Sequence, residues 1–333
     1  MGEAAIVTGS EHAHADGSAG GADRFAWPDD YTALDQGRLR VRPDCAAALQ
    51  QLGWTSVAAV MDAREIHVLR EVDGRDNCTT EIPGAGPAGG PLGVFVKRHR
   101  MPVEAGRSAA PQKSPGLAEA NAAAACRRAS VSTVSVVAAG AVEIAGAGGE
   151  SARVDSFVMT ELMGDRLSAA DYWKTKLAGQ EPVAADVAEA RRGLIGALAL
   201  ATRRLHRASL FHKDLFWNHF FVGQQVDGSF DACLIDLQRL RHISSGWQRC
   251  YWELKDLSQM RLAMYARAVG PEDVKLWYRR YFDVDDDAIE LSPAQRIWAG
   301  LIYARALIRY AGWRWRCLRL GWSGRLPSAA SAD

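Results

Sequence analysis

Two acidic residues on either side of a predicted hairpin constrain this chain more than any other feature. Asp214 stands in the run His212-Lys213-Asp214, and Asp236 follows the apolar pair Leu234-Ile235. A His-x-Asp loop, then a hairpin, then an aspartate after an apolar strand is the layout of a kinase catalytic loop and its metal site. The spacing therefore predicts a phosphoryl-transfer site.

Phosphoryl transfer depends on positioning and on charge neutralisation more than on covalent help from the protein. One carboxylate must accept a hydrogen bond from the acceptor hydroxyl. A second acid must hold Mg²⁺ against the phosphates. Asp214 suits the first role and Asp236 suits the second.

The first half of the chain supplies the lysine and the acid that such a site requires. Lys97 ends an apolar strand, and Glu119 lies on the Ala-rich helix predicted over residues 117–130. A buried lysine needs an acid partner to stay charged and oriented. The segment after the last strand of this half is typical of a kinase hinge, in which backbone groups of Glu161 and Met163 would meet adenine.

The hydrophobic pattern predicts an α+β fold with a sheet-rich first half and a helical second half. We expect residues 1–24 to form a disordered tail, residues 25–163 the sheet-rich lobe and residues 164–333 the helical lobe. Strands are predicted at 56–60, 66–69, 92–97, 131–142, 154–160, 220–222 and 233–235, a loop at 73–91, and helices at 117–130, 183–208, 252–268, 271–282 and 293–320.

Composition is that of a globular protein and names no partner. The 333 residues carry a formal net charge of +1, with 48% hydrophobic and 24% charged residues. No secretory signal or apolar run of membrane-spanning length is present, and the six cysteines have no zinc-site spacing. We expect a cytoplasmic protein that makes, at most, peripheral contact with the inner membrane.

Longer stretches around these motifs resemble one known family. They are Leu205–Leu215, His219–Phe221, Ile235–Arg239 and Lys255–Leu257. Together they resemble the WaaP/InaA lipopolysaccharide kinases, with a match over roughly residues 54–281. The resemblance implies a protein-kinase-like bilobal fold, with a small β-rich lobe and a larger helical lobe. It also implies ATP-dependent phosphorylation of a heptose or Kdo sugar of the lipopolysaccharide core.

The same resemblance implies roles for individual residues. Asp214 would be the catalytic base, Asp236 a magnesium ligand, and Lys97 with Glu119 the pair that grips the ATP phosphates. His219 stands where protein kinases place an asparagine that binds a second metal ion. Asn218 is the alternative ligand, because Mg²⁺ prefers oxygen. Asp256 resembles the helix aspartate that anchors the catalytic loop.

Departures from the protein-kinase pattern bear on the acceptor. No GxGxxG motif precedes Lys97, so we expect the turn at residues 62–65 to cover the phosphates. Asp236 is followed by Leu-Gln, and no Ala-Pro-Glu motif follows. Little chain separates Asp236 from Lys255, which leaves no room for a long activation segment. The sequence therefore favours a glycan or a small molecule over a protein as the acceptor.

The last helix carries a local charge signal in an otherwise balanced chain. Residues 291–332 contain arginines and tryptophans but no aspartate or glutamate. Such a helix suits an anionic membrane surface, although a packed helix with solvated arginines has the same composition. Arg239 and Arg241, just past Asp236, are placed to face an anionic acceptor.

Rival functions remain open at this stage. Another small-molecule kinase or a protein kinase would share the nucleotide site and differ only in the acceptor pocket. A nucleotide-binding pseudokinase scaffold is favoured by the missing Gly-rich loop and by His219, and is disfavoured by the intact Lys97, Asp214 and Asp236. Nucleic-acid binding through the C-terminal helix is not expected, because packing or membrane contact explains its composition.

Overall fold

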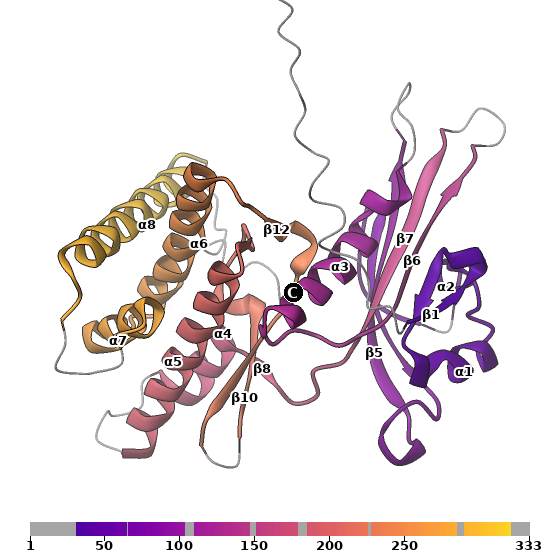
Figure 1. Ribbon diagram of the computed structural model, residues 1–333, viewed down its shortest axis with the longest axis horizontal. Coiled ribbons are helices and arrows are strands. Elements are labelled where there is room, and N and C mark those ends of the chain that lie inside the picture. The colour runs from indigo at the N-terminus through magenta and orange to yellow at the C-terminus, as the bar shows by residue number, and fades with distance from the viewer. Residues whose placement is uncertain are drawn as a thin grey trace, which may run out of the picture.

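The computed structural model divides into a sheet-rich part and a helical part that meet along helix α3 (Figure 1). It describes residues 31–64, 66–103, 110–146, 151–178, 185–225, 228–284 and 290–320. The predicted disordered tail at 1–24, most of the Gly-rich loop at 146–149 and the residues after 320 lie outside this range. The observed division confirms the predicted α+β class.

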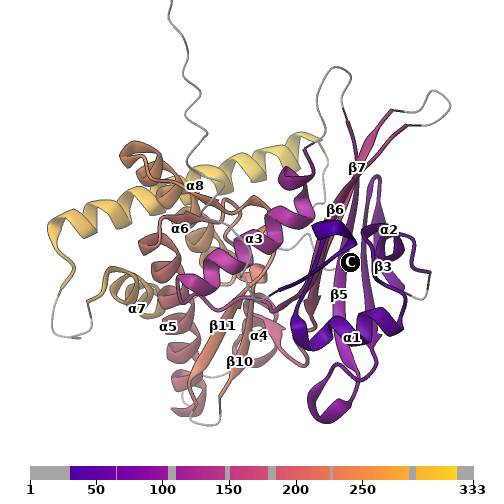
Figure 2. The same cartoon turned by 45° about the vertical axis from the view of Figure 1, so that its right-hand side comes forward.

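The sheet-rich part is built on one seven-stranded antiparallel sheet. Its strand order is β1-β2-β6-β7-β5-β4-β3. The bounds are β1 Thr32–Leu34, β2 Leu39–Val41, β3 His67–Val72, β4 Arg75–Ile82, β5 Leu92–Pro102, β6 Val136–Ile144 and β7 Arg153–Glu161. Helices α1 (Pro43–Gln51) and α2 (Val57–Met61) cover one face, and α3 (Pro115–Arg128) covers the other (Figure 2). The central strands β5 and β7 thus carry the predicted lysine and hinge.

The strand predicted at 56–60 is wrong, because these residues form helix α2. The hydroxyl of Ser56 accepts a hydrogen bond from the amide of Ala59 at 3.1 Å, which is a helix N-cap. Val57 and Val60, whose branched side chains suggested a strand, lie buried on the inner face of the helix. The local cap and the burial of one helical face outweigh the β-propensity of two valines.

The loop predicted at 73–91 is also wrong in part, because β4 occupies Arg75–Ile82. Alternate residues of β4 point inward, but the first of them is Asp76 rather than an apolar residue. Asp76 is buried because its carboxylate binds Arg98 at 2.6 Å and Arg100 at 3.0 Å. Because a charged residue takes one of the inward positions of β4, the alternation of apolar and polar residues expected of a strand is not visible in the sequence.

The hairpin that adjoins the lysine strand is consequently β3–β4, and not the predicted turn at residues 62–65. Its turn residues are Asp73 and Gly74, since Val72 pairs with Arg75. Gly74 has φ +69°, and a Cβ there would lie 2.8 Å from the carbonyl oxygen of Arg100. Only glycine fits this close approach of the hairpin to β5.

The helical part consists of four long helices and a short hairpin that packs against the first of them (Figure 1). Their bounds are α5 Ala185–Arg207, α6 Gly246–Ala266, α7 Pro271–Phe282 and α8 Pro293–Leu320, preceded by the short α4 Ala169–Tyr172. Strands β10 (Phe220–Gln224) and β11 (Phe230–Leu234) form the hairpin, extended by β8 (Leu167–Ser168). A second pair joins β9 (Leu210–Phe211) to β12 (Arg241–His242). These bounds confirm the predicted helices and both predicted strands.

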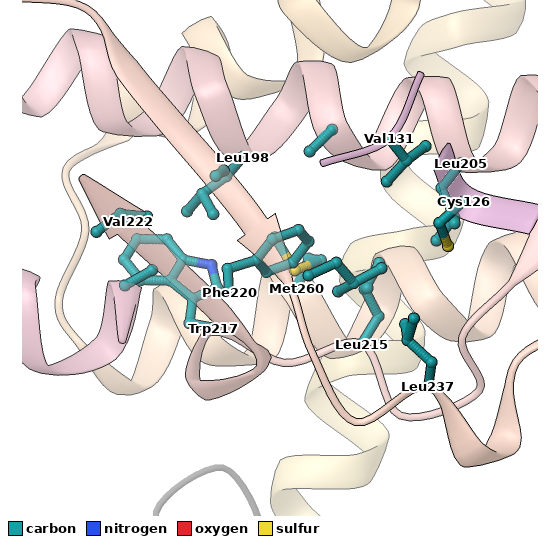
Figure 3. Packing of buried hydrophobic residues seen from close by; sticks show 14 of the residues in the cluster. Cys126, Val131, Leu198, Leu205, Leu215, Trp217, Phe220, Val222, Leu237 and Met260 are labelled. Carbon is teal, nitrogen blue, oxygen red and sulfur yellow. The ribbon is translucent and has the colours of Figure 1, made fainter. Parts of the chain in front are cut away.

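One apolar core holds the two acidic loops in place (Figure 3). Leu215 and Leu237, the residues directly after the two aspartates, are fully buried in it. They pack in the same cluster as Leu205 of α5, Met260 of α6 and Cys126 of α3. The cluster therefore includes α3 from the sheet-rich part, and both acidic loops are attached to it by their apolar neighbours.

Candidate active site

The buried side chain of Lys97 lies between two carboxylates from distant parts of the chain. Its Nζ atom lies 2.8 and 3.0 Å from the two carboxylate oxygens of Glu119 and 3.1 Å from Oδ1 of Asp236. Strand β5 supplies the lysine, α3 supplies the glutamate, and the segment after β11 supplies the aspartate. The structure thus brings three sequence-predicted residues into one cluster.

Burial and charge compete within this cluster, and charge prevails. Burial alone would lower the pKa of Lys97, but Glu119 and then Asp236 raise it above its ordinary value. Burial would raise the pKa of Asp236, but Lys97, followed by His219 and His212, lowers it to about 2. Both groups therefore stay charged at neutral pH, as phosphate and metal binding require.

Helix α6 anchors the loop that carries Asp214. Asp256, fully buried, accepts hydrogen bonds from the backbone amides of His212 at 2.8 Å and Lys213 at 2.9 Å. These bonds hold Lys213 at φ +70°, a left-handed conformation. His212 Nε2 lies 3.0 Å from the carbonyl oxygen of Ile235, next to Asp236. Asp256 and His212 therefore fix the backbone on which the two acids stand.

Asp214 itself is half-buried, and within the described ranges its carboxylate forms no ion pair or hydrogen bond with Lys97 or Asp236. Oδ2 of Asp214 pairs with the guanidinium of Arg239, whose side chain is 57% exposed. Sequence reasoning placed Arg239 toward the acceptor but missed this ion pair. No sequence signal points to it, because the contact forms across two loops.

His219 lies beside Asp236 in a way that suits a cation. Its Nδ1 atom lies 2.7 Å from the carbonyl oxygen of Asp214, so this nitrogen carries the proton and donates it. Burial, then His212, lower the pKa of His219 against the opposing effect of Asp236, so the ring is neutral. Nε2 therefore presents a lone pair to Oδ2 of Asp236 at 3.7 Å. Two electron-rich atoms that face each other in this way fit a metal ion between them.

The donor set also fits Mg²⁺. Across the described part of the chain, no three His, Cys, Asp or Glu side chains gather into a metal-binding group. Mg²⁺ is commonly held by one or two carboxylates together with substrate phosphates and water. Asp236, with His219 beside it, would hold such an ion, which would neutralise phosphate charge during transfer.

The predicted hinge follows β7 at the edge of the cluster. The amide of Glu161 donates to the carbonyl of Ser135 at 2.9 Å, so this N–H is not available to adenine. The Glu161 side chain pairs with Arg42. Met163 reaches across to β11, with its sulfur 3.9 Å from Sγ of Cys233. A role of Glu161 and Met163 in adenine binding stays a prediction.

One buried residue near the cluster escaped the sequence analysis. His99 lies two residues after Lys97 on β5, and therefore on the same face of the strand. It is 3% exposed, and burial, followed by the charges of Arg75 and Lys97, lowers its pKa to about 4. The alternation of faces along β5, which places every second residue on the side of Lys97, is the signal that could have identified this position.

A lysine held between a helix glutamate and a loop aspartate, with a His-x-Asp loop anchored beside it, is the arrangement of a kinase, an enzyme that transfers a phosphoryl group. Comparison with known proteins gives the family. The sequence model described as the lipopolysaccharide kinase (Kdo/WaaP) family matches residues 107–281, which is more than half of the chain. The chain belongs to this family.

Two known proteins resemble this chain, one in sequence and one in fold. The chain is similar to the lipopolysaccharide core heptose(I) kinase WaaP of Pseudomonas aeruginosa, with 27% identity over 230 residues that cover 67% of this chain and 79% of the relative. A solved structure described as WaaP in complex with acyl carrier protein shares the fold, with a TM-score of 0.57 and 22% identity. It covers 81% of this chain and 98% of the other. The family identified from the sequence motifs is thus confirmed.

Proposed function

We propose that this kinase transfers the γ-phosphoryl group of ATP to a hydroxyl of a heptose or Kdo sugar in the lipopolysaccharide core. The observation that carries the proposal is Lys97 held between Glu119 and Asp236, next to an anchored loop that presents Asp214. Membership of the lipopolysaccharide kinase family supports the acceptor class. The core heptose named in its relative WaaP supports the kind of sugar.

Each side chain has one task in this proposal. Lys97, oriented by Glu119, binds the α- and β-phosphates. Asp236, with His219, would hold Mg²⁺, and that ion would neutralise charge on the phosphates. Asp214 accepts a hydrogen bond from the acceptor hydroxyl and orients its oxygen toward the γ-phosphorus. It takes the hydroxyl proton as the new P–O bond forms and the bond from the γ-phosphorus to the β-phosphate oxygen breaks, with ADP as the leaving group.

The test is phosphate transfer from ATP to extracted lipopolysaccharide core, measured with Mg²⁺ for the natural protein and for Asp214→Ala. We expect acceptor-stimulated turnover that Asp214→Ala loses, while ATP binding remains. Asp186→Ala, an exposed aspartate on α5, is the matched control. ATP binding without turnover in the natural protein and in both variants would favour a pseudokinase. Turnover with another sugar or with a peptide would show that the acceptor belongs to a different class.

We also propose that helix α8 lies on an anionic membrane surface. Four large apolar side chains, at positions that share one helical face, are exposed to solvent: Ile297 66%, Leu301 47%, Ile308 72% and Trp315 57%. Exposed arginines flank this face, and residues 291–332 contain no acid. None of the helices in the described ranges is long and apolar enough to span a bilayer.

Vesicle binding tests this contact. The variant Ile308→Glu places a negative charge on the exposed face without touching the core. We expect it to reduce binding to phosphatidylglycerol vesicles sharply, whereas Val68→Glu, at an exposed apolar site on β3, leaves binding unchanged. Equal binding of Ile308→Glu and the natural protein would contradict the membrane contact.

A further inference from the structure

Four basic side chains lie close together beside Asp214, and two of them lie over the ring of one tryptophan. We call Lys213, Arg239, Arg241 and Lys255 the basic cluster. The ammonium groups of Lys213 and Lys255 lie 4.2 and 4.8 Å from the ring centroid of Trp252. Lys255 also donates to the backbone carbonyl of Lys213, so the two lysines are tied to each other and to the catalytic loop.

The basic cluster is poorly compensated by acids of this chain. Burial, then the charges of Arg241, Lys255 and Arg239, lower the pKa of Lys213. Among the described residues, the acids that face the cluster are Asp214 and Asp256, and Arg309 of α8 adds a further positive charge. The oxygens of Asp256 are already bonded to the backbone amides of the catalytic loop.

The carboxylate of Asp214 is the remaining acid, and Arg239 occupies it. The two roles of Asp214 compete, because the guanidinium occupies Oδ2 and leaves only Oδ1 to orient an acceptor hydroxyl. A substrate that offers its own anion to Arg239 resolves the conflict. The guanidinium would then leave the carboxylate as the hydroxyl arrives.

We propose that the basic cluster binds an anionic group, phosphate or carboxylate, that the acceptor carries close to the hydroxyl that is phosphorylated. The proposal rests on the kinase function proposed above and specifies its substrate: a sugar that is already charged. Arg239 is the positioning residue that exchanges Asp214 for this group, and Arg241 is the exposed arginine that binds it. Neutral sugars would leave Arg239 on Asp214.

The geometry assigns the cluster to the acceptor and not to the nucleotide. Lys97 and the metal site at Asp236 attract the phosphates of ATP. Among the described side chains, no hydrogen bond or ion pair joins Lys97 or Asp236 to the basic cluster. The cluster instead surrounds Asp214, the group that meets the acceptor. A loss of affinity for ATP rather than for the acceptor would therefore contradict the assignment.

Binding without turnover tests the proposal independently of the kinase reaction. The ligand is extracted core oligosaccharide, titrated by calorimetry into nucleotide-free protein, in its intact, dephosphorylated and carboxyl-reduced forms. We expect Arg241→Gln to weaken binding of the intact ligand about tenfold, Arg241→Lys to restore most of it, and Arg192→Gln, an exposed arginine on α5, to change nothing. The treatment that abolishes this difference identifies the anion as phosphate or carboxylate.

Kinetics supply the second readout. In the natural protein the acceptor KM should rise steeply with salt, because exposed charges are screened. Arg239→Gln should raise the acceptor KM about tenfold and leave the ATP KM unchanged. Unchanged binding of all three ligand forms by Arg241→Gln, or an acceptor KM that falls in Arg239→Gln, would overturn the proposal even if the enzyme is an active sugar kinase.

Discussion

Lys97 is a buried cation whose charge and orientation depend on two carboxylate partners, Glu119 and Asp236. Glu119→Gln removes one charge and one strong acceptor. We expect the free energy of unfolding to fall by about 2 kcal/mol, less than for a fully orphaned buried charge because Asp236 remains. Turnover should fall at least about tenfold, because the lysine loses its orientation. Urea unfolding and ATP turnover measure both effects.

Glu143→Gln is the control for this change, since Glu143 is an exposed glutamate on β6. It should leave stability and turnover unaltered. A Glu119→Gln protein with natural turnover would show that Asp236 alone orients Lys97, and the proposed nucleotide site would lose its central pair.

His99 makes the stability of the protein depend on pH. Its pKa in the folded protein is about 4, against 6.5 for a free histidine, mainly because it is buried. As pH falls from about 6.5 to about 4, the unfolded chain binds the proton first, so stability decreases over this window and is unaffected above it. The expected loss is about 3 kcal/mol. Urea midpoints of the natural protein and His99→Gln across this range should converge at low pH.

His67, an exposed histidine on β3, provides the comparison. His67→Gln should keep the full pH dependence. If His99→Gln loses stability between pH 6.5 and pH 4 as steeply as the natural protein does, another group is responsible for the decrease.

Sequence reasoning found the site residues that lie close together along the chain. It missed the residues whose contacts or burial arise only when distant segments pack together. Asp214 and Asp236 flank a single hairpin, so their order along the chain was enough to place them. The pairing of Arg239 with Asp214 depends on how two loops meet, which no periodicity encodes. His99 lies on β5 two residues beyond the end of the predicted strand at 92–97, and it carries no motif.

At the scale of elements, helix α6 is the support of the catalytic loop. Asp256→Ala leaves the buried amides of His212 and Lys213 without their acceptor. We expect a loss of about 3 kcal/mol in stability, because charge-assisted bonds to two buried amides disappear. Turnover should fall about a hundredfold, since small displacements of a catalytic group have effects of this size. Urea unfolding and phosphate transfer are the measurements.

The isosteric variant Asp256→Asn separates geometry from charge. Its single acceptor oxygen can serve only one of the two amides, so both losses should be intermediate. Asp256→Ala with normal turnover would mean that the left-handed turn at Lys213 holds the loop unaided.

Elements were predicted well where one residue type repeats with a clear period and poorly where polar residues face inward. The Ala-rich α3 and the long α5 fall close to their predicted bounds. Strand β4 was taken for a loop because its inward Asp76 is neutralised by arginines of the next strand. Its burial depends on partners that lie far along the chain, so propensity alone could not reveal it.

At the scale of the whole molecule, helix α3 of the sheet-rich part packs into the core of the helical part. Its small side chains, among them Ala120 and Ala123, are buried in the same cluster as Leu198 of α5 and Met260 of α6. A second cluster lies on the other face of the sheet, under α1 and α2. A division of the chain at residue 163 would cut through the first of these cores.

This arrangement predicts that the sheet-rich and helical parts unfold in one transition. Free cysteines already report on each region: Cys45 and Cys78 are buried in the cluster under α1 and α2, Cys126 lies in α3, and Cys233 lies in β11. Thiol labelling at increasing urea, read by mass spectrometry, should expose all four at one midpoint. Exposed Cys250 should label throughout and serves as the control. Labelling of Cys45 and Cys78 at lower urea than Cys233 would show that α3 does not couple the two parts, and that the lysine–glutamate pair can be lost while the catalytic loop stays folded.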